Sequence, residues 1–368
     1  MSLQKLSIHL ELPPLAVLSF PPSYPRSSIL APIQAHSSLR EPFKINPDVF
    51  NFTIDIRFPF TIAAVYIAAV ILMNEVNCRR LNKPWNFSKT RPFKSLVIIH
   101  NFLLALFSGW AFWSICQALG SSWPAWEDPN LLAHAARALC QTDVSSEKQV
   151  PLHKYNLWDQ GLAYVGWLFY LSKFYEVVDT MIILARGKKS STLQTYHHAG
   201  VMICGWVAIR YKSPAALVGV FLNSFVHTLM YSYFALVAAA VPVSMRIKRA
   251  MTTIQITQFL LGFVLGYSYL LVAYDVSTPR HSSLGNRVTP SSYTYIPNTQ
   301  ASNLTLNMNH PVWLPNTLEP KETMAYTKLH CLQDSGKAFP IVVTTIYVVP
   351  LLYMFCCFFN RAYSKRPG

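Results

Sequence analysis

The stretch LWDQGLAYVGWLFYLSKFYEVVDTMIILA, residues 157–185, is apolar enough to cross a bilayer yet carries charged residues in its interior. A bilayer core of roughly 30 Å requires about 20 consecutive, mainly apolar residues in a helix. Backbone polar groups in lipid must be paired, which a helix achieves within one segment and an open strand does not. The stretch therefore predicts a transmembrane helix with a polar stripe.

Six further stretches share this apolar character. They lie at about residues 58–73, 95–118, 190–209, 214–241, 252–274 and 339–359, and the first is short for a membrane span. Hydrophobic residues make up 52% of the chain and charged residues only 13%, whereas soluble domains carry about 25% charged residues. We predict an all-α, polytopic membrane helix bundle of about seven transmembrane helices.

The basic residues gather on one side of this arrangement, which argues against a nucleic-acid partner despite a net charge of +15. Three inter-helix segments and the C-terminus hold 15 of the 31 Lys and Arg residues: Arg79, Arg80, Lys83, Lys89, Arg91, Lys94, Arg186, Lys188, Lys189, Arg246, Lys248, Arg249, Arg361, Lys365 and Arg366. Because cytoplasmic loops are enriched in Lys and Arg, these segments are predicted to be cytosolic.

This topology divides the chain into three parts. Residues 1–50, with eight prolines, are expected to form a disordered luminal tail. Residues 51–360 form the membrane domain with a luminal loop at 275–337, and residues 361–368 form a basic cytosolic tail. The dibasic end resembles an endoplasmic reticulum retrieval signal, although a basic membrane anchor explains it equally well.

Two luminal features test the topology. Cys140 and Cys331 both fall in predicted luminal segments, where oxidising conditions permit a disulfide; two free thiols are the alternative. The sequon Asn303-Leu304-Thr305 lies in the 275–337 loop and is a candidate glycosylation site.

Polar residues form stripes on four successive predicted helices. They are Lys173, Glu176, Asp179 and Thr180; Gln194, His197 and His198; Asn223, His227 and Tyr231; and Thr252, Gln255 and Gln258. Their spacings of three and four place each set on one helix face. Ionisable groups in membrane helices usually face a cavity or a partner, so they are candidate site residues. Structural ion pairs and interhelical hydrogen bonds are the alternative.

A metal centre is the weaker interpretation of the histidines. Four of them, His100, His197, His198 and His227, lie in predicted spans, and no carboxylate or thiol completes a zinc set with ordinary spacing. Integral-membrane desaturases need several histidine boxes, and Gln194 stands where such a box would need a histidine. We expect no metal and no bound cofactor.

The ordered motifs resemble those of the ELO family of very-long-chain fatty acid elongases. They are Lys173-x-x-Glu176-x-x-Asp179-Thr180, His197-His198, Asn223-x-x-x-His227-x-x-Met230-Tyr231-x-Tyr233, and Thr252-x-x-Gln255-x-x-Gln258, and the resemblance covers about residues 55–360. One departure is Gln194, which replaces the first histidine of the family's His-x-x-His-His box. An amide can hydrogen-bond but not titrate, so we expect Gln194 to orient a neighbour.

The resemblance implies an endoplasmic reticulum enzyme that condenses acyl-CoA with malonyl-CoA to 3-ketoacyl-CoA, with an acyl tunnel inside the bundle. It implies a ketoreductase, a dehydratase and an enoyl reductase as partner enzymes in a lipid membrane; self-association is open. His197 is then the candidate nucleophile or base and His227 its partner. Asn223, Thr252 and Gln255 are candidate oxyanion donors. The CoA phosphates would meet Arg186, Lys188, Lys189, Arg246, Lys248 and Arg249.

Other classes of protein fit the polar stripes less well. A lipid or proton-coupled transporter is the main alternative, because intramembrane Lys, Glu, Asp and His also suit a proton relay. Such transporters often contain broken helices or inverted repeats, and this sequence shows neither clearly. A seven-span receptor does not need such dense polar stripes.

Overall fold

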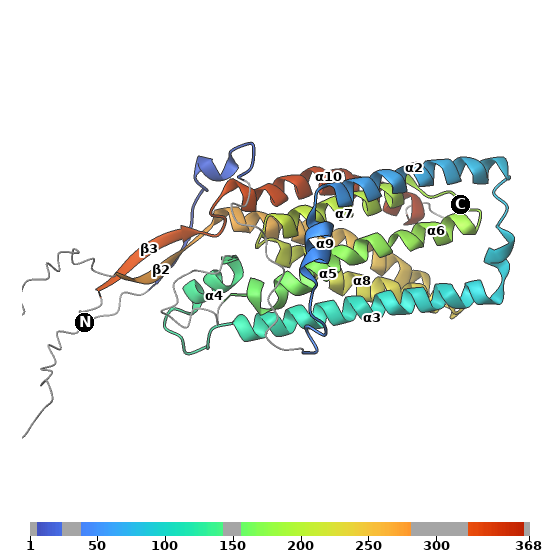
Figure 1. The fold of residues 1–368 in the computed structure, drawn as a ribbon. Coiled ribbons are helices and arrows are strands. Elements are labelled where there is room, and N and C mark those ends of the chain that lie inside the picture. The colour runs from blue at the N-terminus through green and yellow to red at the C-terminus, as the bar shows by residue number, and fades with distance from the viewer. Residues whose placement is uncertain (1–5, 24–37, 143–155, 281–322, 364–368) are drawn as a thin grey trace, which may run out of the picture.

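The computed structural model describes residues 6–23, 38–142, 156–280 and 323–363. Long helices run side by side, with a small sheet at one end of the bundle (Figure 1). The helices are α1 (Pro47–Ile54), α2 (Arg57–Arg79), α3 (Arg91–Ser122), α4 (Leu131–Cys140), α5 (Ala163–Tyr175), α6 (Val177–Ala185), α7 (Thr192–Arg210), α8 (Ala216–Ala238), α9 (Met245–Leu271) and α10 (Ser335–Tyr363). Short 3-10 helices occur at η1 (Leu15–Leu18) and η2 (Asn86–Lys89).

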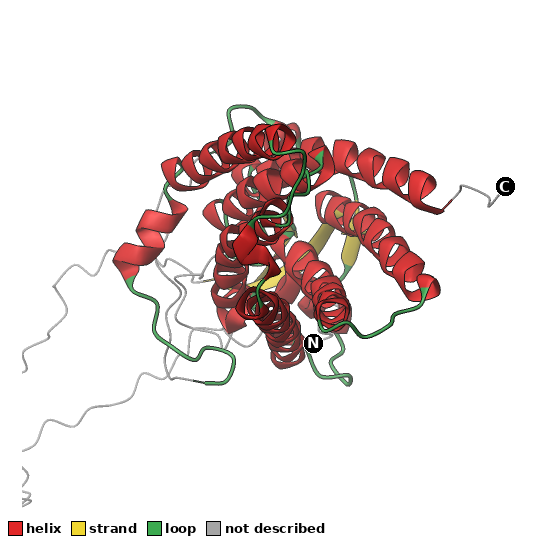
Figure 2. Cartoon of the chain, turned by 90° about the vertical axis from the view of Figure 1, so that its right-hand side faces the viewer, coloured by secondary structure: helices red, strands yellow, loops and turns green. Residues whose placement is uncertain are grey.

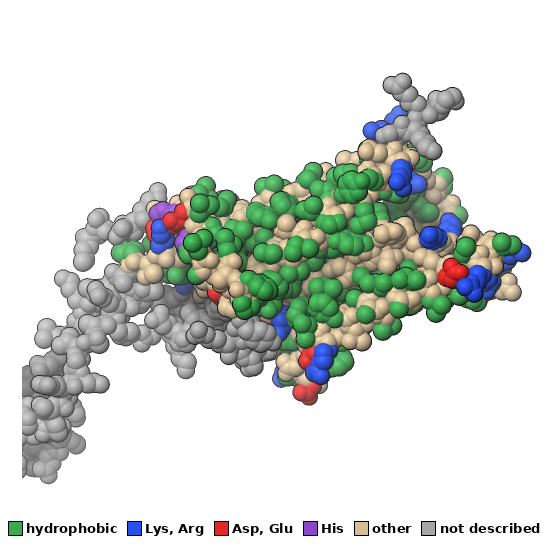
Figure 3. All heavy atoms as spheres, turned by 90° about the horizontal axis from the view of Figure 1, so that it is seen from above, with side chains coloured by type: hydrophobic (Ala, Val, Ile, Leu, Met, Phe, Trp, Pro, Cys, Tyr) green, Lys and Arg blue, Asp and Glu red, His purple; other side chains and the backbone are tan. Residues whose placement is uncertain are grey.

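Five helices, α2, α3, α8, α9 and α10, are long and apolar enough to cross a membrane. Hydrophobic side chains dominate the middle of the face seen in Figure 3, and Lys and Arg gather toward the end opposite the sheet. This is the architecture of a polytopic membrane helix bundle, as predicted. The number of seven crossings stays a prediction, because α5 and α6 are each short and α7 carries Gln194, His197 and His198 in its first turns.

The stretch at 157–185 is three segments rather than one continuous helix. A π-helical turn, η4 (Trp158–Leu162), contains Gly161 at φ 132°, a backbone conformation that side chains with a Cβ rarely adopt. The second interruption lies at Glu176, between α5 and α6. These interruptions place the charged residues of the stretch at a helix break inside the bundle.

A three-stranded antiparallel sheet modifies the all-helical expectation. Its order is β1 (Ile8–Leu10), β2 (Val272–Arg280) and β3 (Thr323–His330), with Ile8 opposite Tyr274 and Ala273 opposite His330. The expected 275–337 loop therefore begins and ends as paired strands. Asn303 lies outside the described residues.

The N-terminal region is also more ordered than its prolines suggest. Besides β1 it contains η1, whose Val17 is buried in a cluster with Tyr274 of β2 and Leu332. The expectation of a disordered tail over residues 1–50 is therefore wrong for residues 6–23. Strand pairing and apolar burial fix this segment, and both depend on residues more than 250 positions away.

Cys140, the last residue of α4, forms a disulfide with Cys331, which directly follows β3. Both cysteines are buried in the same apolar cluster as Tyr274 and Leu332. The disulfide therefore ties α4 to the sheet at one end of the bundle.

The remaining helices pack so that polar stripes on different helices converge. Helix α3 packs along α8, and α7 contacts α2, α5 and α10. Seen along the bundle, the helices pack closely side by side, and the strands are visible among them (Figure 2). The polar first turns of α7 lie beside α6 and α10, because Gln194 approaches Thr180 of α6 and His197 approaches Tyr347 of α10.

Candidate active site

Lys173 and Glu176 form a buried ion pair at the break between α5 and α6. The ammonium Nζ of Lys173 lies 2.6 Å from Oε1 of Glu176, and the side chains are each only 2% exposed. Lys173 also donates to Oδ1 of Asn223, at 3.1 Å. The predicted stripes on α5 and α8 are therefore brought together, and their charges neutralise each other inside the bundle.

His227 completes this group from α8. Its Nδ1 lies 3.5 Å from both Lys173 Nζ and Glu176 Oε1. One ring nitrogen thus faces a cation and an anion at once, so its protonation decides which of the two it bonds. Asn223 and His227 lie one helical turn apart, which explains how both reach the same ion pair.

Asp179 belongs to a second network, built with α3. Its Oδ1 accepts from Nε2 of His100 at 2.8 Å, and its Oδ2 accepts from the hydroxyl of Tyr231 at 2.7 Å. The other ring nitrogen of His100, Nδ1, lies 3.2 Å from the hydroxyl of Tyr175. The histidine that Asp179 bonds is therefore His100, which is not among the predicted site residues.

Gln194 orients His198, as its lack of a titratable group suggests. Its Nε2 lies 2.8 Å from Nε2 of His198 and 3.4 Å from Oγ1 of Thr180. An amide nitrogen can only donate, so Nε2 of His198 accepts and its proton sits on Nδ1. The hydroxyl of Tyr66 on α2 lies 2.9 Å from Thr180, which extends this network to the edge of the bundle.

His197 has a partner that the motifs did not reveal. Its Nδ1 lies 2.8 Å from the hydroxyl of Tyr347 on α10. His197 and His198 are adjacent, so on a helix their side chains point about 100° apart. They therefore enter different hydrogen-bond networks although both belong to the predicted motif.

The predicted polar residues of α9 take separate positions. Gln255 donates to the sulfur of Met230 at 3.1 Å and lines a cavity with Gln258. Thr252 instead donates to the backbone oxygen of Lys248 at 3.3 Å, within its own helix, and is outside the lining of both site cavities. Thr252 is therefore not an oxyanion donor in this structure, contrary to expectation.

Two cavities meet at His197. The larger, about 820 Å³, is lined by the polar residues Glu176, Asp179, Gln194, His197, His198, Asn223, His227, Tyr231, Gln255 and Gln258. The smaller, about 220 Å³, runs among largely apolar side chains of α5, α7, α8, α9 and α10. His197, Asn223, Gln258 and Phe259 line both. His197 and His227 therefore both line the larger, polar cavity, and His197 also lines the smaller, largely apolar one.

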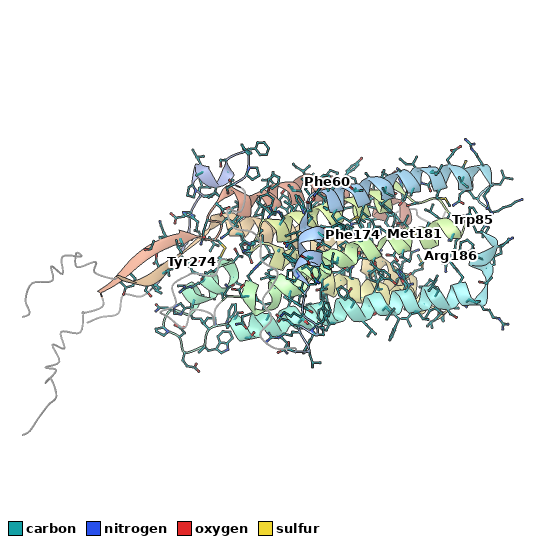
Figure 4. All side chains as sticks on the ribbon, viewed as in Figure 1. Phe60, Trp85, Phe174, Met181, Arg186 and Tyr274 are labelled. Carbon is teal, nitrogen blue, oxygen red and sulfur yellow. A yellow bond between two sulfur atoms is a disulfide. The ribbon has the colours of Figure 1, made fainter. Side chains whose placement is uncertain are left out.

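Basic residues surround the other end of the larger cavity. Its lining includes Lys89, Arg91, Lys94 and Arg186. Arg186 lies near Trp85 at the end opposite the sheet (Figure 4). Of the predicted CoA-binding residues only Arg186 lines this cavity; those outside its lining are Lys188, Lys189, Arg246, Lys248 and Arg249. Arg249 instead lies over the ring of Phe359.

The residues that sequence reasoning missed come from outside the motifs. Tyr347 sits in an apolar helix, and in the sequence Lys89, Arg91 and Lys94 indicate only the membrane topology. His100 is one of the four histidines in predicted spans but belongs to none of the predicted polar stripes. Its position in an apolar stretch was the one available signal, because a buried histidine usually needs a partner.

Comparisons with known proteins agree with the motifs. The profile of the ELO family, described as the GNS1/SUR4 family, matches residues 52–368. The chain is similar to long chain fatty acid elongase 1 of Caenorhabditis elegans, with 37% identity over 27% of this chain and 35% of the relative. It is also similar to human very long chain fatty acid elongase 6, with 38% identity over 31% of this chain and 45% of the relative.

A third relative, fatty acid elongase 2 of Trypanosoma brucei brucei, shares 31% identity over 40% of this chain and 53% of its own length. The matched part of the chain thus spans about a third to a half of the length of these curated relatives. No solved structure matches the chain. Because the family profile extends over most of the sequence and the helices form a multi-pass membrane bundle, the chain belongs to the ELO (GNS1/SUR4) family.

Proposed function

We propose that this protein elongates fatty acids by condensing a long-chain acyl-CoA with malonyl-CoA. The products are a 3-ketoacyl-CoA, carbon dioxide and free CoA. The position of His197 carries the proposal, because this imidazole stands where a polar cavity with a basic end meets an apolar cavity. The names of the related proteins, which are fatty acid elongases, support the same reaction.

The two cavities suit the two halves of an acyl-CoA. The phosphates of CoA would be attracted to Lys89, Arg91, Lys94 and Arg186 at the basic end. The acyl chain would lie in the cavity between α7, α8, α9 and α10, whose lining is largely apolar. The thioester between these two parts would then lie beside His197.

His197 is the proposed nucleophile. Attack of its neutral imidazole on the thioester forms a C–N bond and breaks the C–S bond, whose electron pair leaves as CoA thiolate. Malonyl-CoA then loses carbon dioxide, and the electrons of the broken C–C bond form an enolate. The enolate attacks the acyl carbon, the C–N bond breaks, and the imidazole is restored while the thiolate takes a proton from water.

The buried ion-pair group supports this chemistry. Asn223 uses its Oδ1 to accept from Lys173, so its amide N–H groups remain available to a developing oxyanion in the cavity that it lines. The Lys173 ammonium, fixed beside Asn223 and His227, supplies positive charge next to the reacting carbonyl. His227 is placed to bind or activate the malonyl group, since it lines the same cavity.

The cellular setting follows from the proposed reaction. The basic end of the bundle and the C-terminus would face the cytosol, and the sheet and its disulfide would face the lumen of the endoplasmic reticulum. A ketoreductase, a dehydratase and an enoyl reductase must process the 3-keto product before the next cycle, so these enzymes are the proposed partners.

The test is an assay of the purified protein with radiolabelled malonyl-CoA and a panel of acyl-CoAs. We expect labelled 3-ketoacyl-CoA, and we expect His197→Ala and His227→Ala to lower turnover by about 10²-fold or more while both variants remain folded. A protein that moves lipid across vesicles without incorporating label would favour the transporter. Acyl-CoA alone should leave the acyl group on the His197 peptide; its absence would favour direct condensation.

A further inference from the structure

We propose that Tyr347 is a positioning residue that holds His197 in its Nδ1-protonated form, which leaves Nε2 as the reactive nitrogen. This inference rests on the proposed function of His197. The hydroxyl of Tyr347 is 2.8 Å from Nδ1 of His197, and it also donates to the backbone oxygen of His197 at 3.3 Å. Tyr347 and His197 are 150 positions apart in the sequence and lie on different helices.

The count of protons decides the tautomer. A phenol carries one proton, so the two contacts are hydrogen bonds at the same time only if that proton goes to the backbone oxygen of His197 and Nδ1 donates to the phenol oxygen. The phenol oxygen must then accept at Nδ1, so the neutral ring carries its proton there. Nε2 keeps its lone pair, which is the pair that attack on a thioester carbon requires.

The packing around Tyr347 fixes the hydroxyl in this position. The ring of Tyr196 stacks on the ring of Tyr347 with centroids 5.6 Å apart and planes 20° apart. The hydroxyl of Tyr196 donates to the backbone oxygen of Tyr347 at 3.2 Å. Two contacts thus hold α10 against α7 beside His197.

Gly200 provides the space for the ring. A Cβ at Gly200 would overlap two ring carbons of Tyr347. Gly200 lies three residues after His197, so it is on the same face of α7. A larger residue would therefore displace the phenol from the imidazole without touching the imidazole itself.

The arrangement follows the general logic of an oriented imidazole. An imidazole that reacts through one ring nitrogen needs a hydrogen-bond partner on its other ring nitrogen, because that partner selects the tautomer. Among the predicted site residues the acids Glu176 and Asp179 contact other histidines, His227 and His100. A tyrosine hydroxyl is left to perform it for His197.

The test combines kinetics with nitrogen NMR of protein labelled with ¹⁵N-histidine, in which His197 is assigned by its loss in His197→Gln. We expect His197 of the wild-type protein to be protonated at Nδ1 and bare at Nε2. Tyr347→Phe keeps the ring but removes the hydroxyl, so the other tautomer should appear. Its kcat should fall about tenfold, as expected for one lost hydrogen bond, with the KM for acyl-CoA little changed.

Two further variants make the test specific. Gly200→Ala should reproduce the tautomer change of Tyr347→Phe with the hydroxyl still present. Tyr353→Phe, on the exposed face of the same helix, should behave as wild type. Protonation of wild-type His197 at Nε2, or an unchanged tautomer and kcat in Tyr347→Phe, would overturn the proposal. Wild-type protein that shows the expected tautomer but no elongation would refute the proposed function and leave the role of Tyr347 in setting the tautomer supported.

Discussion

Nζ of Lys173 lies 2.6 Å from Oε1 of Glu176 at the interruption between α5 and α6, and both side chains are almost completely buried. Their spacing of three residues brings them to one helix face, and the break at Glu176 lets Asn223 and His227 of α8 reach the same pair. The two charges therefore neutralise each other inside the bundle, and the pair also holds Asn223 and His227 of the candidate site in place.

Removal of one partner should cost more stability than removal of both. Lys173→Met leaves the carboxylate of Glu176 buried without its ammonium partner, and we expect it to lower the free energy of unfolding by about 3–5 kcal/mol. In Lys173→Met/Glu176→Leu neither charge of this pair remains, so much of that stability should return. Thermal unfolding in detergent measures both. A double variant less stable than either single variant would show that the charges themselves stabilise the bundle.

The network of Asp179 should behave as one cooperative unit. Tyr231→Phe removes one hydrogen bond to Asp179, and Asp179→Asn presents an amide in place of one of two acceptor oxygens. We expect each variant to lose about 1–3 kcal/mol of stability. The double variant should lose less than the sum, because both changes affect the same bond. Strictly additive losses would mean that the hydroxyl and the carboxylate act independently.

The disulfide at the sheet end should stabilise the fold without affecting the chemistry directly. Cys140 and Cys331 are separated by 191 positions, so their bond restricts the unfolded chain strongly. We expect Cys140→Ser to cost about 2–5 kcal/mol and to remove the effect of reductant on the melting temperature. Cys78→Ser, at an exposed free cysteine, is the matched control. Peptide mapping that finds both thiols of the pair free in the native protein would contradict the expectation.

The sequence predicted the bundle well because each apolar stretch is a local signal. The stretch at 58–73 looked short, yet α2 runs from Arg57 to Arg79. Its extra turns contain polar side chains that find hydrogen-bond partners within the protein. Asn77 donates to the backbone oxygen of Leu184, and Asn74 donates to the backbone oxygen of Ser190. Hydropathy does not reveal such partners, since they lie more than 100 positions away.

The same limitation explains what was missed in the site. The spacing of the polar residues indicates that they face inward. In the structure Glu176, His197, Asn223 and His227 line the larger cavity, and Lys173 bonds Glu176 and lines the smaller cavity. Which carboxylate serves which histidine is set by the packing of α3, α8 and α10, so His100 and Tyr347 could not be assigned. The strand pairing of residue 8 with residue 274 depends on the same kind of distant contact.

Gln194 offers a test of orientation against proton transfer. Its amide donates to Nε2 of His198, and the opposite ring nitrogen, Nδ1 of His198, has no hydrogen-bond partner among the described residues. The hydrogen bond from the Gln194 amide is therefore the one polar contact of that ring among the described residues. Gln194→Leu removes it and should lower kcat about tenfold, the effect of one lost hydrogen bond. Gln194→His can restore a donor, so most of the activity should remain.

The pH dependence separates the two roles of position 194. If Gln194 only orients His198, Gln194→His should have nearly the pH–rate profile of the wild-type protein, since the added imidazole does not enter proton transfer. If instead this position must titrate for efficient turnover, Gln194→His should exceed wild-type activity and acquire a new limb near neutral pH. Because the amide cannot take up a proton, we expect the first result. Profiles of kcat at saturating malonyl-CoA, recorded for wild type, Gln194→His and Gln194→Leu, decide between them.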